Sequence, residues 1–317
     1  MAACGTEGLL IARLGVVHTA QRAAFAASPF LPFGHLVFTG SPALAPQVMR
    51  AAATNLTPVT LELGGKSPAL IAPGQSHLAA AARAVAHGKA FNAGQACVAP
   101  DYALVPRAQV ATFAAAVERA FRVLYPSLAG GADYTSIVND RHHARILALL
   151  ADARAKGAVV TAAGEIGTDR RLPLYIVTQV REDMRIAREE LFGPILPVIG
   201  YDSIEEAIAY IAARPRPLAL YPFGFPESTL HTLLERTHSG GVTVNDWGWH
   251  VFDHDLPFGG TGASGMGTYH GEEGFRELSH GKAVFKRHRF FPVRLFFPPY
   301  GTWIQRIILH LYLGKAP

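Results

Sequence analysis

Short runs of strand-forming residues alternate with alanine-rich segments along most of the chain, and this alternation constrains the fold more than any other feature. Residues 9–17, 35–40 and 57–63 have the apolar, β-branched composition of strands, and alanine-rich helical segments separate them at 19–27 and 43–53. Parallel neighbouring strands need a long crossover connection, which is usually a helix. The alternation therefore predicts an α/β fold with a parallel sheet.

The same reasoning predicts a second α/β lobe further along the chain. Helices are expected at 76–91, 108–124 and 141–157, and strands at 158–164, 172–180 and 195–202. The glycine-rich stretch at 256–275 is expected to be an ordered loop rather than a helix, because such a stretch needs positive φ angles. The apolar C-terminal segment, with helical spacing in its second half, is expected to pack on another surface. No uncharged apolar run reaches the roughly 18 residues of a spanning helix.

Composition argues against several classes of protein. With 317 residues, 50% of them hydrophobic, the chain is long enough for a substantial core and two lobes. The 29 Lys and Arg exceed the 24 Asp and Glu by five, but the basic residues are scattered, so no nucleic-acid partner is expected. Two cysteines cannot form a disulfide framework, which favours a reducing, cytoplasmic setting. The histidines lack partners at metal-ligating spacing, so no metal site is predicted.

The stretch FNAGQACVAP, residues 91–100, contains Cys97, one of the two cysteines. Alone, a cysteine in an apolar chain is typically a small buried side chain. Here Gly94 permits a close backbone approach and Pro100 stiffens the exit, which suits a thiol presented at a turn. A thiol that forms an acyl intermediate needs a base. Glu62 ends a strand just before a diglycine turn, where side chains commonly face a cleft, although a strand-end glutamate is otherwise typical of a solvated position.

Five segments resemble, in the same order, those of the aldehyde dehydrogenase superfamily. VTLELGGKSPALI carries Glu62 and is followed by GKAFNAGQACVAPDY with Cys97; the others are FTGSPALAPQVM (38–49), REELFGPILPV (188–198) and LPFGGTGASGMGTYHGEEGF (256–275). The VAPDY and GMGTYHG variants are most similar to the branch that contains coniferyl aldehyde dehydrogenase and fatty aldehyde dehydrogenases. The resemblance implies oxidation of an aryl or long aliphatic aldehyde to the acid with NAD or NADP.

The resemblance also implies roles for individual residues. Cys97 would attack the aldehyde to form a thiohemiacetal, which gives its hydride to the nicotinamide, and Glu62 would then activate water to hydrolyse the thioester. The helix start after residue 41 suits a pyrophosphate. The residues that the resemblance places around the cofactor are Gly40, Ser41, Leu63, Glu190 and Phe192. Asn245 is expected on the substrate side. The aromatics Trp247, Trp249 and Phe252 have two interpretations, the lining of an apolar or aryl-binding tunnel and ordinary packing.

The implied architecture is an aldehyde dehydrogenase-like α/β fold with a catalytic lobe and an incomplete Rossmann-like cofactor lobe. Residues 1–62 would be a remnant of the cofactor-binding domain, 63–246 the catalytic domain, and 247–317 a C-terminal loop and oligomerisation segment. Relatives carry a longer N-terminal part, with a Pro-Trp-Asn segment whose asparagine amide contributes to the oxyanion hole. No such segment occurs here, so the chain is interpreted as N-terminally truncated. Ala45 stands where the family usually has a glycine close to the cofactor.

Three functions stay open at this point: an aldehyde dehydrogenase of the coniferyl type, a truncated and catalytically impaired relative or fragment, and a cofactor-independent thiol esterase. Loss of one oxyanion-hole donor typically costs about 10²- to 10³-fold in rate, which motivates the second. The expected partners are a small-molecule aldehyde and a second copy of the chain in a homodimer. Peripheral contact of the apolar tail with a membrane surface is a further option.

Overall fold

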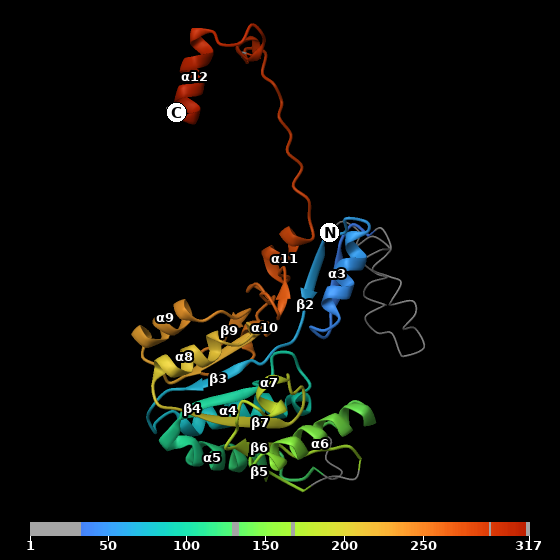
Figure 1. Cartoon of the computed structure of the whole chain (residues 1–317), viewed down its shortest axis with the longest axis vertical. Coiled ribbons are helices and arrows are strands. Elements are labelled where there is room, and N and C mark those ends of the chain that lie inside the picture. The colour runs from blue at the N-terminus through green and yellow to red at the C-terminus, as the bar shows by residue number, and fades with distance from the viewer. Residues whose placement is uncertain (1–32, 129–132, 166–168, 292, 315–317) are drawn as a thin grey trace. The chain divides into compact units, whose positions relative to one another are not determined.

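The computed structural model describes residues 33–128, 133–165, 169–291 and 293–314. Its contacts form two compact units, Met1–Leu278 and Ser279–Pro317. The main unit contains two β-sheets with helices packed against them (Figure 1). The strand predicted at 9–17 and the helix at 19–27 lie outside the described residues.

The larger sheet has seven strands in the order β5-β6-β7-β4-β3-β8-β9, and every neighbouring pair is parallel except β5 with β6. The strands are β3 (Pro68–Ile71), β4 (Tyr102–Pro106), β5 (Val159–Ala162), β6 (Tyr175–Thr178), β7 (Ile195–Tyr201), β8 (Ala219–Phe223) and β9 (Gly241–Val242). The three strands predicted between 158 and 202 are thereby confirmed as β5, β6 and β7. The central strands β3 and β8 are buried along their whole length, as expected of a parallel sheet with both faces covered.

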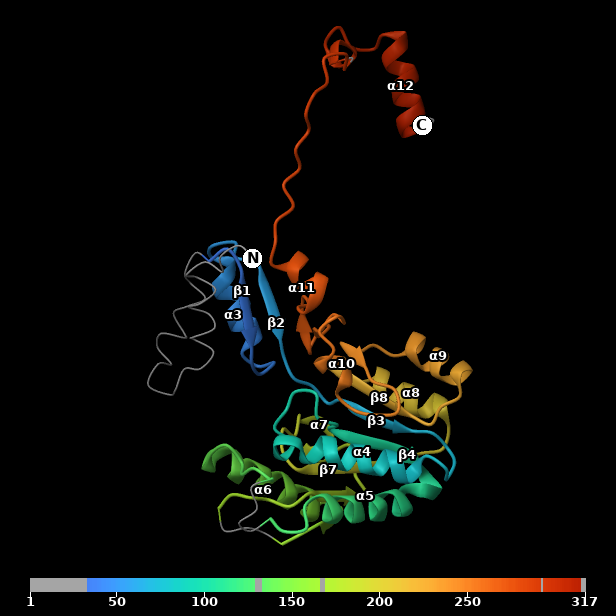
Figure 2. The same ribbon diagram turned by 180° about the vertical axis from the view of Figure 1, so that it is seen from behind.

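Helices cover both faces of this sheet (Figure 2). Successive side chains of a strand point to opposite faces. Ala69 and Ile71 of β3 accordingly join one apolar cluster, and Leu70 joins the other. The first cluster includes α4 (Leu78–Ala90), α5 (Val110–Leu124) and α6 (Asp140–Ala155), and the second includes α8 (Ile204–Ala212) and α9 (Glu227–Arg236). The helices α4, α5 and α6 confirm the three helices predicted from the sequence.

The smaller sheet has β2 (Val59–Glu62) at its centre, with β1 (Leu36–Thr39) parallel on one side and β10 (Gly265–Met266) antiparallel on the other. Helix α3 (Ala45–Ala53) packs against it, which confirms the strand, helix and strand predicted for 35–63. Ala45 is the first residue of α3 and is buried. Pro46 follows in the first turn, where its missing N–H leaves no hydrogen bond unmade.

The glycine-rich stretch 256–275 contains the positive φ angles that were expected, including those of Gly262 and Gly267. The expectation of a loop throughout was wrong at its end, because α11 (Gly271–Glu277) begins there. Two glutamates in its first turn interact favourably with the helix N-terminus. The remaining short elements of the main unit are η3 (Phe91–Gly94), η4 (Arg107–Gln109), α7 (Arg185–Arg188) and α10 (Trp249–Phe252).

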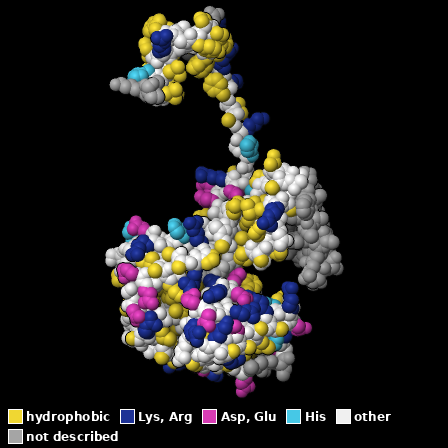
Figure 3. Space-filling view, in the orientation of Figure 1, with side chains coloured by type: hydrophobic (Ala, Val, Ile, Leu, Met, Phe, Trp, Pro, Cys, Tyr) yellow, Lys and Arg dark blue, Asp and Glu magenta, His cyan; other side chains and the backbone are white. Residues whose placement is uncertain are grey.

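The C-terminal unit contains η5 (Val293–Phe296) and α12 (Trp303–Leu313). Thr302 and Gln305 form a capping box that starts α12, so the predicted helical spacing is confirmed. None of the α12 residues is buried, and hydrophobic side chains cover much of the surface of this unit (Figure 3). In the part of the chain that the structure describes, no helix combines the length and apolar character needed to cross a membrane.

Candidate active site

A cavity of about 810 Å³ is lined by residues from five separate segments of the main unit. It contains the predicted nucleophile Cys97, the predicted base Glu62 and all five predicted cofactor residues. Asn245 is not among its lining residues. The lining residues are Thr39, Gly40, Ser41, Pro42, Ala43, Glu62, Leu63, Gly64, Gln95, Ala96, Cys97, His142, Arg145, Glu189, Glu190 and Phe192. Residues as far apart in the sequence as Thr39 and Phe192 thus meet at one place, which sequence spacing alone does not establish.

Cys97 follows a tightly wound segment after α4. Asn92, Ala93 and Gly94 all have positive φ angles of 49°, 54° and 72°, and a side chain on Gly94 would place its Cβ 2.4 Å from the Gly193 carbonyl oxygen. Gly94 therefore permits a close approach to a neighbouring loop. The Ala99 N–H donates to the Ala96 carbonyl at 3.0 Å, which closes the turn that presents Cys97.

Gln95 anchors the entrance of this turn. Its amide nitrogen donates to the Ser136 carbonyl at 3.2 Å, and its amide oxygen accepts from the Val138 N–H at 2.9 Å. The side chain is almost fully buried, so these hydrogen bonds tie the segment before Cys97 to the segment that leads into α6. The thiol is consequently held on a defined backbone.

Glu62 is the last residue of β2, and its main chain is paired on both sides. Its carbonyl accepts from the Gly40 N–H at 3.0 Å, and its β10 partner is Gly265. The side chain is 3% exposed, and neither carboxylate oxygen has a hydrogen-bond partner among the described residues. Burial without a partner disfavours the charged form and raises the pKa of Glu62 to about 8. A carboxyl group with this pKa is mostly protonated at neutral pH, and its ionised fraction is a stronger base than an ordinary carboxylate.

The Cys97 thiol has a raised pKa as well. Burial is the largest cause, and the Glu190 and Glu62 carboxylates act in the same direction. The main-chain N–H groups of Cys97 and Val98 oppose this by stabilising the thiolate. Glu190 itself has a pKa raised by burial, while the hydrogen bond from the Gly65 N–H to its carboxylate, at 3.0 Å, favours its charged form. The cavity thus contains a nucleophile and two carboxyl groups whose charges are interdependent.

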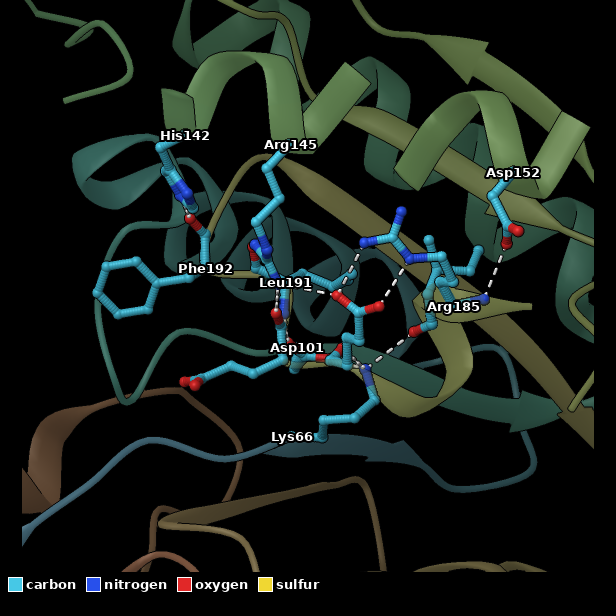
Figure 4. Close-up of polar contacts among 11 residues, drawn as sticks. Lys66, Asp101, His142, Arg145, Asp152, Arg185, Leu191 and Phe192 are labelled. Carbon is cyan, nitrogen blue, oxygen red and sulfur yellow. Dashed lines mark hydrogen bonds and ion pairs between the residues drawn. The ribbon is translucent and has the colours of Figure 1, made fainter. Parts of the chain in front are cut away.

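The segment that carries Glu190 is fixed by a buried ion pair between Lys66 and Asp101 (Figure 4). Lys66 also donates to the Glu189 carbonyl at 3.0 Å, and the second carboxylate oxygen of Asp101 accepts from the Leu191 N–H at 2.8 Å. Lys66 follows the Glu62 strand and Asp101 follows the Cys97 turn. One ion pair therefore connects the segments of the base, the nucleophile and Glu190.

His142 and Arg145 line the cavity but were not predicted as site residues. The His142 ring nitrogen Nε2 lies 2.7 Å from the Phe192 carbonyl oxygen, and Arg145 donates to the Leu191 carbonyl at 2.9 Å (Figure 4). The two residues are three positions apart on α6 and share one helix face. The three-residue spacing could have shown that both side chains lie on one helix face. It could not have shown that this face contacts the segment of Leu191 and Phe192.

The residues predicted on the substrate side occupy a different region. Asn245 is exposed, has a φ of 61°, and accepts a hydrogen bond from the Gly224 N–H at 2.7 Å. Trp247 is buried, and its indole N–H donates to His87 at 3.0 Å. Trp249 and Phe252 are more than half exposed and contact each other edge to face. Their role toward a substrate stays a prediction.

A second cavity of about 550 Å³ adjoins the first, since Pro42, Gly64 and Glu190 line both. Three arginine side chains, Arg188, Arg214 and Arg216, contribute to its wall. Within the described ranges, no group of three or more His, Cys, Asp or Glu side chains has an arrangement that could hold a metal ion.

Comparisons with known proteins agree with this arrangement. Residues 24–284 match the model of the aldehyde dehydrogenase family. A probable coniferyl aldehyde dehydrogenase of Pseudomonas aeruginosa is 49% identical over 283 residues, which are 89% of this chain and 59% of that protein. The chain therefore spans well under two thirds of the length of this relative.

Solved structures show the same fold. The substrate-bound AldH of Staphylococcus aureus superposes with a TM-score of 0.82 and 36% identity, over 92% of this chain and 63% of that one. An aldehyde dehydrogenase of Mycobacterium tuberculosis complexed with NAD+ has a TM-score of 0.76 and 30% identity, over 84% of this chain and 56% of that one. The expected α/β fold is confirmed, and the chain belongs to the aldehyde dehydrogenase family.

Proposed function

We propose that this chain carries the reaction centre for NAD(P)-dependent oxidation of an aldehyde to the carboxylic acid. The observation that carries the proposal is the shared cavity of Cys97 and Glu62, in which the carboxylate is buried without a partner. A soft nucleophile and a separate base with a raised pKa are the two groups that acyl formation and hydrolysis require.

The steps follow from these two side chains. The Cys97 sulfur adds to the carbonyl carbon and forms a thiohemiacetal, while the thiol proton passes to a base. Loss of hydride from that carbon leaves a thioester on Cys97. Glu62 then takes a proton from water, which attacks the thioester and releases the acid and the thiol. In this proposal the Cys97 main-chain N–H, which favours the thiolate, also donates to the developing oxyanion.

The cavity walls fit a nicotinamide dinucleotide. When bound, such a cofactor accepts the hydride. Gly40 and Ser41 would hold the phosphates at the turn before α3, and Leu63, Glu190 and Phe192 would hold the nicotinamide end. A side chain at Gly64 would place its Cβ 2.1 Å from the Glu190 carboxylate, so the carboxylate would have to leave its present position beside the Gly65 N–H. NAD and NADP both stay open.

The substrate that we propose is an aryl or long aliphatic aldehyde. The similar protein of Pseudomonas aeruginosa is described as a probable coniferyl aldehyde dehydrogenase, and the exposed pair Trp249 and Phe252 offers apolar rings for such a molecule. Asn245 is assigned to the same side of the site.

The test is aldehyde-dependent formation of NADH or NADPH by the purified chain, with coniferyl aldehyde, a long aliphatic aldehyde and glyoxylate as substrates. We expect turnover of the first two, loss of all turnover in Cys97→Ala, and loss of product release with a retained first acylation step in Glu62→Gln. Calorimetry with NAD+ and NADP+ separates failure to bind cofactor from failure of chemistry.

Two other functions are distinguished by the same assays. No turnover, with intact NAD+ binding, would indicate a truncated and catalytically impaired relative. Hydrolysis of an activated ester that needs Cys97 but no cofactor would indicate a thiol esterase, which the Cys97 and Glu62 pair alone supports. The first candidate is preferred because the cavity includes all five predicted cofactor residues besides the catalytic pair.

For the C-terminal unit we propose association with a second copy of the chain. Residues 279–317 contain no Asp or Glu, so their charged side chains are all basic, and all 24 acidic residues lie before them. Trp303, Ile307 and Leu311 form an exposed apolar stripe on α12. Sedimentation of Ile307→Asp against the unmodified chain tests this, with loss of dimer expected. A monomeric unmodified chain that binds anionic vesicles would instead indicate peripheral membrane contact.

A further inference from the structure

Tyr221 is a buried residue that the proposed reaction leaves unassigned. It lies in β8, its side chain is 0% exposed, and its hydroxyl donates a hydrogen bond to the main-chain carbonyl of Val98. Val98 directly follows the nucleophile Cys97. A buried phenol hydroxyl needs a partner, and here the partner belongs to the nucleophile turn.

The hydrogen bond fixes one end of a peptide unit whose other end is already fixed. The carbonyl of the peptide between Val98 and Ala99 accepts from Tyr221, and its N–H closes the turn by donating to Ala96 at 3.0 Å. Since a peptide unit is planar, holding both of its polar groups prevents its rotation. Cys97 and Val98 are the two central residues of the turn that this peptide closes.

The orientation of the turn determines the surroundings of the Cys97 sulfur. Burial raises the pKa of the Cys97 thiol, and the facing carboxylates of Glu190 and Glu62 raise it further, whereas the N–H groups of Cys97 and Val98 oppose them. These donors keep their direction only while the turn keeps its shape. The pKa of Tyr221 is raised well above its ordinary value by burial and then by Cys97, so the phenol stays a neutral donor within electrostatic reach of the sulfur.

We propose that Tyr221 is a positioning residue for the nucleophile: by holding the Val98 carbonyl, it keeps the donors of the turn directed at the sulfur and so maintains the reactivity of Cys97. The inference rests on the proposed function, which makes Cys97 the catalytic nucleophile. The test is independent of that function, because alkylation of a thiol needs neither cofactor nor aldehyde. A chain without any turnover would still answer the question about Tyr221.

The test compares Tyr221→Phe with Tyr201→Phe. The first removes the hydroxyl and keeps the ring that packs near His250. Tyr201 is a matched control, because its buried hydroxyl also donates to a main-chain carbonyl, that of Ile71, but the residue belongs to the cluster on the opposite face of the sheet. The rate of Cys97 alkylation by iodoacetamide is measured across pH for both variants and the unmodified chain, with peptide mass spectrometry to assign the label.

We expect Tyr221→Phe to react about two- to tenfold more slowly near pH 7.5, the range that one buried hydrogen bond represents. The titration midpoint should move to higher pH while the limiting rate at high pH is unchanged. Tyr201→Phe should follow the unmodified chain. A superimposable profile for Tyr221→Phe would overturn the proposal, as would equal slowing in Tyr201→Phe. Thermal unfolding is recorded in parallel, and a variant that unfolds is measured in sucrose, which favours the folded state.

Discussion

Replacing Glu62 by Gln should make folding stability less dependent on pH, by an amount that the structure specifies. Burial raises the pKa of Glu62 from 4.5 to about 8, while the unfolded chain should titrate near the ordinary value. Below about pH 4.5 the Glu62 carboxyl is protonated in both the folded and the unfolded chain, so its burial places no charge in the interior. As pH rises from there toward about 8, the folded protein must keep a proton that the unfolded chain releases, and stability is lost.

The size of this loss follows from about 1.36 kcal/mol per pKa unit, which gives about 5 kcal/mol across the whole window and about 2.7 kcal/mol between about pH 5.5 and 7.5. Gln has no charge to bury. The free energy of unfolding of Glu62→Gln should therefore rise, relative to that of the unmodified chain, by about 2.7 kcal/mol between about pH 5.5 and 7.5. Its stability advantage should stop growing above about pH 8.

The assay is urea unfolding followed by far-UV circular dichroism at a series of pH values, with thiols kept reduced. Glu165→Gln, which removes an exposed carboxylate from the loop after β5, is the matched control. The reasoning is refuted if the difference between Glu62→Gln and the unmodified chain stays constant from about pH 5.5 to 7.5, because the carboxylate would then be stabilised in the folded state as it is in water.

Two further predictions concern the segments around the cavity. Gly64→Ala should strongly reduce turnover, because its Cβ would lie 2.1 Å from the Glu190 carboxylate and displace it; turnover equal to that of the unmodified chain would contradict this. Asp101→Asn should lower the free energy of unfolding by about 3 kcal/mol, since it leaves Lys66 without its buried counter-charge, whereas Asp202→Asn, in an exposed pair, should have a much smaller effect. Equal losses in the two variants, measured by urea unfolding, would show that Lys66 finds another partner.

Sequence patterns predicted β1, β2, β5, β6 and β7 but missed β3, β4 and β8, which all belong to the larger sheet. Strand β1 alternates between buried and less buried positions, so its period was visible. Strands β3 and β8 are buried at every position, which removes the alternation and leaves short apolar runs without a period. The central strands of the larger sheet were therefore the hardest to recognise.

Some residues of the candidate site were predicted from the sequence and others were not. Cys97 and Glu62 were predicted from the resemblance of their two segments to the paired active-site segments of the aldehyde dehydrogenase superfamily, because each residue taken alone is also typical of a structural position. The contacts of His142 and Arg145 with the Phe192 segment depend on how α6 packs across the chain, which local residues do not encode. Domain boundaries stay a prediction, as does the substrate side at Asn245.

Glu62 and Cys97 reach their cavity from different sheets: the base ends a strand of the three-stranded sheet, and the nucleophile follows a helix that packs on the seven-stranded one. The distance between Glu62 and Cys97 therefore depends on the position of the two sheets relative to each other. Two described segments join the sheets, one between β2 and β3 and one between β9 and β10, and Lys66 in the first donates to the Ile186 and Glu189 carbonyls. A ligand that contacts both sheets therefore affects the reaction in two ways. It makes its own contacts with the reacting groups, and it sets the distance between Glu62 and Cys97.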